Sequence, residues 1–97
     1  MDEGELTQAR ILIVDDEEGN IRVLERILAK FGYKTVKSTT SPRTVASLYT
    51  TWKPDLILLD LQMPDLDGIG VLDELRPLIP HDSFVPVLML TGDQSQE

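Results

Sequence analysis

Four side chains that could take part in chemistry each follow a short apolar run of the sequence. Asp15 and Asp16 come directly after Ile-Leu-Ile-Val, and Asp60 comes after Leu-Ile-Leu-Leu. Thr91 likewise comes after Val-Leu-Met-Leu. If these runs are neighbouring parallel strands, their carboxyl ends share one edge of a sheet, where the four side chains would meet. Carboxylates held this close resist ionisation unless a cation lies between them. The pattern therefore predicts a cation site.

The ligand types narrow the choice of ion and of reaction. The chain has no cysteine and a single histidine, His81, which excludes thiolate and multi-histidine metal sites within one chain. Carboxylate oxygens favour Mg²⁺, Mn²⁺ or Ca²⁺, and Mg²⁺ is the ion expected beside a phosphate group. With such an ion bound, a carboxylate can attack a phosphoryl group in line, and the Thr91 hydroxyl could bond a phosphoryl oxygen. The predicted chemistry is phosphoryl transfer to an aspartate.

Taken singly, each of these signals has an ordinary structural explanation. An Asp-Asp pair after a strand most often caps a helix, and Asp60 before a turn is equally common. The argument for a site depends on all of them following strands in one alternating array. We therefore interpret the set as functional, and His81 as an ordinary loop residue.

Length and charge set the class of protein. The 97 residues are 41% apolar and carry a net charge of −8, which fits one acidic domain with a core of its own. Direct nucleic-acid binding by this chain is not expected, because an acidic surface repels the phosphate backbone. No apolar run approaches a membrane span, and the acidic start differs from a secretory signal. We expect a cytoplasmic protein with a loose lead-in over residues 1–9 and one domain over 10–97.

The elements needed to position the site alternate along the chain. Apolar runs predict strands, and the strands are expected over residues 11–14, 34–38, 56–59 and 84–90. Pro86 is unusual inside the last of them, because proline cannot donate to a strand ladder. Helices are expected between the strands, since apolar residues recur there at helical spacing; the faces expected to be buried are Ile21, Leu24, Ile27, Leu28 and Phe31, then Val45, Leu48, Tyr49 and Trp52, then Ile69, Leu72 and Leu75.

Capping residues mark where the helices begin and end. Asp16 or a neighbour is expected to cap the first helix, which Gly32 would end, and Ser41-Pro42 would start the second. Strands that alternate with helices indicate right-handed crossovers and a parallel α/β sheet.

The motifs together resemble the receiver domain of two-component response regulators. The matching segments are residues 11–17, 54–60, 63–68 and 87–92, which read ILIVDDE, PDLILLD, MPDLDG and VLMLTG. Four motifs in this order and at this spacing make the resemblance specific, and it extends over nearly the whole chain.

The resemblance implies a fold and a set of roles. The fold would be a flavodoxin-like, doubly wound parallel sheet. Asp60 would be the phosphoacceptor and would receive its phosphoryl group from a histidine kinase or a histidine phosphotransfer protein. Asp16, Asp60 and the backbone carbonyl of Gln62 would bind Mg²⁺, with Asp15 acting through a metal-bound water. Thr91 would be the switch hydroxyl.

Further implications concern the loop after the acceptor and the end of the chain. Pro64 and Gly68 would shape that loop. Receivers also have a fifth strand, which ends in a lysine, and a last helix. This chain ends at Glu97, so we expect both to be missing and the strand order to be 2-1-3-4. Residues 84–90 would then form a sheet edge, through which a homodimer is possible.

Three functions are compatible with these features. The first is a phosphoacceptor that switches conformation and is not an enzyme, apart from possible slow autodephosphorylation. The second is a haloacid-dehalogenase-like phosphatase, which requires a further aspartate where this chain has Gln62. The third is a receiver-like module that binds proteins or dimerises without being phosphorylated, which the missing lysine favours.

Overall fold

The computed structural model describes residues 8–63, 66–80 and 85–90. Within these residues, strands and helices alternate along the chain. Their order is β1 (Ile11–Val14), α2 (Glu18–Lys30), β2 (Val36–Thr39), the 3₁₀ turn η1 (Pro42–Thr44), α3 (Val45–Trp52), β3 (Leu56–Asp60), α4 (Gly68–Leu75), the 3₁₀ turn η2 (Arg76–Leu78) and β4 (Val87–Leu90). The strands form one sheet of order β2-β1-β3-β4, and every pairing is parallel. The predicted flavodoxin-like fold and strand order are confirmed.

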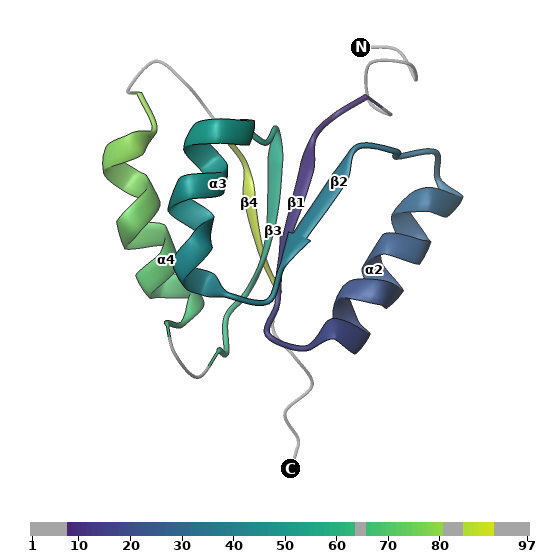
Figure 1. Ribbon diagram of the computed structural model, residues 1–97, viewed down its shortest axis with the longest axis horizontal. Coiled ribbons are helices and arrows are strands. Elements are labelled where there is room, and N and C mark those ends of the chain that lie inside the picture. The colour runs from purple at the N-terminus through teal and green to yellow at the C-terminus, as the bar shows by residue number, and fades with distance from the viewer. Residues whose placement is uncertain (1–7, 64–65, 81–84, 91–97) are drawn as a thin grey trace.

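The sheet is covered on both faces (Figure 1). Helices α3 and α4 lie side by side over one face, and α2 lies over the other. Alternate residues of the central strands pack into the two cores: Leu12, Val14 and Leu59 face α3 and α4, whereas Ile11, Ile13 and Leu58 face α2. Strands buried on both faces explain why β1 and β3 are continuous apolar runs in the sequence.

The helix faces agree with the predicted spacing in part. All four apolar residues predicted for α3 pack in the core. On α2, however, Phe31 is 71% exposed, because it lies at the C-cap, where the helix ends. On α4, Ile69 is 55% exposed, and Val71 and Leu75 are the buried apolar residues. The prediction was wrong for Phe31 and Ile69, and also for Ile27, which is 47% exposed. A helical repeat alone does not fix which side of a helix faces the sheet.

Several predicted boundaries shift by a few residues. The second helix starts with η1, and α3 itself begins at Val45 rather than at Pro42. The Ser41 side chain makes no capping bond, and the Ser41 amide donates a hydrogen bond to Thr39 Oγ1 at 3.1 Å. Asp60 belongs to β3, whose predicted end was Leu59.

The last strand is also shorter than predicted. β4 begins at Val87, and Pro86 precedes it, where its missing N–H removes no ladder bond. The Pro86 carbonyl still accepts a hydrogen bond from the Ile57 amide at 3.1 Å.

Strand β4 pairs only with β3 within the described part of the chain, so it is an edge of this sheet. Its Leu88 is 53% exposed, which is unusual for a large apolar residue of a strand that would otherwise be buried. A homodimer through this edge stays a prediction. Within the described residues, no helix has the length and apolarity required to cross a membrane.

Candidate functional site

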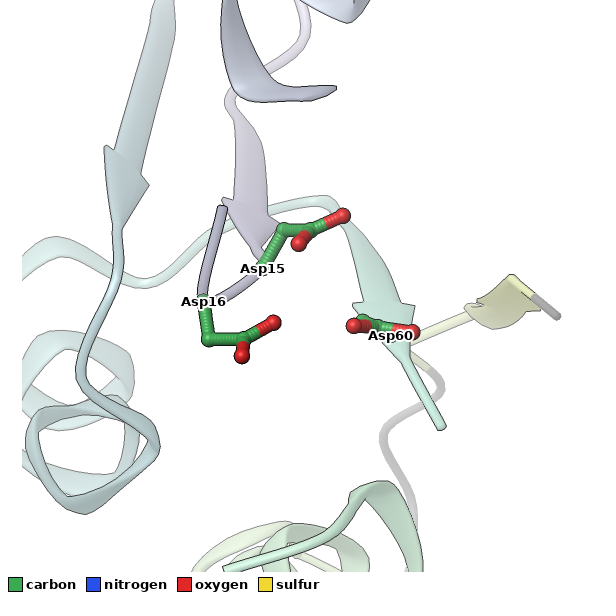
Figure 2. A group of neighbouring side chains, drawn as sticks. All are labelled: Asp15, Asp16 and Asp60. Atoms are coloured by element: carbon green, nitrogen blue, oxygen red, sulfur yellow. The ribbon is translucent and has the colours of Figure 1, made fainter. Parts of the chain in front are cut away.

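Three aspartates from two neighbouring strands meet at the carboxyl edge of the sheet. Asp15 and Asp16 follow β1, and Asp60 ends β3, which pairs with β1 in parallel. One carboxylate oxygen of each residue lies within 4.8 Å of one oxygen of each of the others. Figure 2 shows the Asp16 and Asp60 carboxylates turned toward the space between the two strands. The structure thus brings together Asp15, Asp16 and Asp60 as predicted, whereas Thr91 and Pro64 lie outside the described residues.

Two of these carboxylates accept hydrogen bonds from nearby backbone amides. The Glu17 amide donates to Asp15 Oδ1 at 3.0 Å, and the Gln62 amide donates to Asp60 Oδ1 at 3.2 Å. Each donor lies two residues after its aspartate, which is the pattern of an Asx turn. The sequence reasoning missed both amides, although an aspartate that ends a strand before a loop is the signal for such a turn. These bonds fix how the two buried carboxylates point.

Asp16 is free of the capping role that was one of its predicted uses. The N-cap of α2 is Glu17, whose side chain makes no capping bond. The Glu17 amide donates its hydrogen bond to Asp15, so Asp15 holds the start of the helix. The Asp16 side chain instead faces Asp60. Of the residues predicted to cap this helix, Asp16 or a neighbour, the N-cap is the neighbour Glu17, and the Asp16 carboxylate lies in the acidic cluster.

The cluster is electrostatically unfavourable without a cation. Asp15 is 4% exposed and Asp60 is 7% exposed, so both carboxyl groups are largely withdrawn from water. Burial is the main cause that raises the pKa of Asp60, and the charges of Asp15 and Asp16 raise it further. The hydrogen bond from the Gln62 amide acts in the opposite direction and lowers this pKa. The backbone amide of Gln62 therefore stabilises the ionised form of Asp60, whereas burial and the two neighbouring carboxylates destabilise it.

The raised pKa of Asp60 predicts a pH dependence of stability in metal-free protein. As the pH rises, the unfolded chain loses the Asp60 proton first, so the folded state binds more protons and its stability falls until the folded pKa has been passed. We expect Asp60→Asn to remove this loss of folding stability, because asparagine does not ionise. In EDTA, its free energy of unfolding at neutral pH should exceed that of the wild type, and the difference should vanish below the ordinary aspartate pKa.

Urea unfolding from pH 3 to pH 8 measures this effect, with Asp73→Asn as the control because Asp73 is an exposed acid on α4. A neutral-pH stability of Asp60→Asn equal to or below that of the wild type would contradict the assigned electrostatics.

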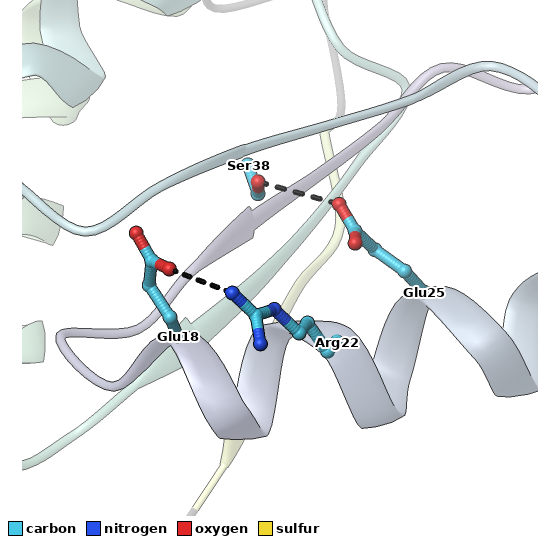
Figure 3. Close-up of polar contacts among 4 residues, drawn as sticks. All are labelled: Glu18, Arg22, Glu25 and Ser38. Carbon is cyan, nitrogen blue, oxygen red and sulfur yellow. Dashed lines mark hydrogen bonds and ion pairs between the residues drawn. The ribbon is translucent and has the colours of Figure 1, made fainter.

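No side-chain cation offsets the cluster within the part of the chain that the structure describes, since the ion pairs found there involve other acids. The basic residue on the first turns of α2 is Arg22, and it pairs with Glu18 at 3.3 Å (Figure 3). One turn further on, Glu25 accepts a hydrogen bond from Ser38 Oγ at 3.4 Å, which joins α2 to β2. These four residues line a polar groove between α2 and β2, and Arg22 is already paired there with Glu18.

The donor set fits a hard divalent cation. It consists of carboxylate oxygens, two of them on buried residues oriented by backbone amides and one on the more exposed Asp16. Mg²⁺ typically binds one or two carboxylates and keeps several waters, which a cluster open on one side permits. The fit rests on charge as well, because a bound dication would lower the pKa of Asp60, against the burial and the neighbouring carboxylates that raise it.

Comparison with known proteins places this geometry in a family. The model of the response regulator receiver domain matches residues 11–97. The probable transcriptional regulator ycf27 of Guillardia theta is 40% identical over 89% of this chain, and the regulatory protein AtoC of Escherichia coli is 39% identical over 86% of it. This chain covers 32% of the ycf27 protein and 17% of AtoC, so both relatives are much longer.

Solved structures with the same fold include a chemotaxis protein and a signal receiver domain. The chemotaxis protein CheY4 of Vibrio cholerae superimposes with a TM-score of 0.78 at 27% identity, over 91% of this chain and 72% of that one. The signal receiver domain of a putative Luxo repressor protein from Vibrio parahaemolyticus gives a TM-score of 0.76 at 26% identity, over 91% and 65%. With its motifs, its sheet and its acidic cluster in agreement, the chain belongs to the response regulator receiver domain family of two-component signal transduction.

Proposed function

We propose that this domain accepts a phosphoryl group on Asp60 in a Mg²⁺-dependent reaction and passes the signal on as a change of conformation. The observation that carries the proposal is the convergence of Asp15, Asp16 and Asp60 within 4.8 Å at one edge of the sheet. A merely structural aspartate would not be buried beside two others, because each adds to the cost of ionising the rest.

Each residue has a separate task in this reaction. An Asp60 carboxylate oxygen bonds to phosphorus as the bond from phosphorus to the donor's histidine nitrogen breaks, and the nitrogen keeps that electron pair. The Gln62 amide holds one Asp60 oxygen, leaving the other for attack. Asp16 and Asp15 supply the negative charge that binds the cation, directly and through water respectively, and the Gln62 carbonyl is proposed as a further ligand. When bound, Mg²⁺ would offset the charge of the phosphoryl oxygens.

The proposed partners follow from the chemistry of the donor. Receiver domains in general interact with histidine kinases or histidine phosphotransfer proteins, and we propose such a donor here. We propose no catalytic turnover of a substrate, since the domain consumes its own carboxylate in forming the acyl phosphate. The change of state then biases an equilibrium between two conformations.

The function is tested by the mass of the intact protein. The chain is incubated with Mg²⁺ and phosphoramidate or acetyl phosphate, and a mass increase of one phosphoryl group is expected. EDTA should prevent it. A folded sample that binds Mg²⁺ but never gains mass would favour the alternative, a protein-binding module that is not phosphorylated. Continuous release of phosphate from monoesters would instead indicate a phosphatase.

A further inference from the structure

Helix α4 begins in unusually close contact with the backbone of the proposed acceptor. A Cβ atom added to its first residue, Gly68, would lie 2.8 Å from the carbonyl oxygen of Asp60 and 3.0 Å from Cα of Leu61. It would also lie 3.3 Å from Cε of Met89, on the neighbouring strand. The first two obstacles are main-chain atoms at the end of β3 and just after it, so they cannot turn aside as the end of a flexible side chain could.

The same contact is reinforced by hydrogen bonds on both sides of Leu61. The Gly68 amide donates to the Leu61 carbonyl at 3.1 Å, which closes the loop between β3 and α4. The Leu61 amide donates in turn to the Leu90 carbonyl of β4 at 3.1 Å. Leu61 is thus fixed between the start of α4 and the end of β4.

This fixed backbone holds the group that orients the acceptor. The peptide that follows Leu61 carries the Gln62 amide, which donates to Asp60 Oδ1. A shift of Leu61 would therefore move the amide and the Asp60 main chain together, and the carboxylate would turn with them. Misplacement by about 1 Å can slow a positioned reaction about 100-fold.

We infer that Gly68 is a positioning residue for phosphoryl transfer: the absence of its side chain lets the start of α4 set the Asp60–Gln62 backbone and thereby aim the carboxylate. The inference rests on the proposed function of Asp60. It assigns to Gly68 a role in the rate of the reaction, in addition to any role in stability.

Two other glycines of the chain provide matched controls. A Cβ at Gly70, in the same helix, would meet the Leu66 side chain at 2.5 Å, and its three nearest atoms belong to Leu66 and Asp67. A Cβ at Gly19, in α2, would meet nothing within 4 Å. Gly70→Ala therefore reports crowding in α4 away from Asp60, and Gly19→Ala reports the substitution itself.

The experiment compares the rates at which the wild type and the three alanine variants gain the phosphoryl group. Rates are measured by intact mass at saturating Mg²⁺, over a range of phosphoramidate concentrations, and are divided by the folded fraction from circular dichroism. We expect Gly68→Ala to lower the maximal rate at least about tenfold, and Gly70→Ala and Gly19→Ala to stay within about twofold of the wild type.

The outcomes separate the inference from the proposed function. If the wild type gains no phosphoryl group, the proposed function is wrong. If the wild type does and Gly68→Ala matches its maximal rate, the assignment to Gly68 is wrong.

If Gly68→Ala does not fold, the inference is tested by amide hydrogen exchange in the wild-type protein. Because coupling between two sites is reciprocal, phosphorylation of Asp60 should change the exchange rate of the Gly68 amide at least about fivefold and leave that of Gly70 unaltered. An unchanged Gly68 amide in fully phosphorylated protein would overturn the inference.

Discussion

Asp60→Asn is expected to abolish formation of the phosphoryl adduct. The asparagine side chain has nearly the shape of aspartate and can still accept the hydrogen bond that the Gln62 amide donates at 3.2 Å. Its amide is a far weaker nucleophile than a carboxylate, so the rate should fall by more than about 1,000-fold. The readout is the mass of the intact protein after incubation with Mg²⁺ and phosphoramidate.

The interpretation depends on showing that the variant remains folded. Asp60→Asn should be at least as stable as the wild type in EDTA, because it removes a buried charge from beside Asp15 and Asp16. Loss of the adduct therefore cannot be attributed to unfolding. Asp73→Asn, which changes an exposed acid on α4, should gain the phosphoryl group at the wild-type rate. If Asp60→Asn formed as much phosphoryl adduct as the wild type, the acceptor would have to be another residue.

The sequence was sufficient to predict the sheet and the acidic cluster. β1 and the first four residues of β3 are apolar, and aspartates come directly after both runs, so the buried strands and the shared edge follow from a few residues. The strand order was implied by the resemblance to receiver domains, and the parallel pairing follows from the alternation with helices. These features are determined by local patterns that have few alternative solutions.

Other features depend on tertiary contacts that no local pattern encodes. Ile69 and Val71 are both apolar residues of α4, and only packing against the sheet decides that Val71 is buried and Ile69 exposed. The close approach of Gly68 to Asp60 requires the whole arrangement of β3, β4 and α4.

Asp16→Ala is expected to weaken Mg²⁺ binding at least about 100-fold. Loss of a residue that only supports a metal ligand typically costs 10–100-fold in affinity, and Asp16 is proposed as a direct ligand. Asp16 is also the member of the cluster with no backbone amide donating to its carboxylate within the described residues, so its charge is free for the cation. Isothermal titration calorimetry with MgCl₂ measures the affinity, and Glu25→Ala is the control, because it removes an acid outside the cluster.

The direction of the stability change separates a ligand from a structural residue. Removing Asp16 relieves repulsion on Asp60, so the pKa of Asp60 should fall toward its ordinary value and metal-free Asp16→Ala should be no less stable than the wild type. Added Mg²⁺ should stabilise the wild type and have much less effect on the variant, because only binding to the folded state contributes. Equal Mg²⁺ affinity in the two proteins would show that Asp16 is not a ligand of the cation. The acidic cluster is thus expected to lower the stability of the metal-free fold and to raise its affinity for the cation. The Asp16→Ala variant allows both effects to be measured.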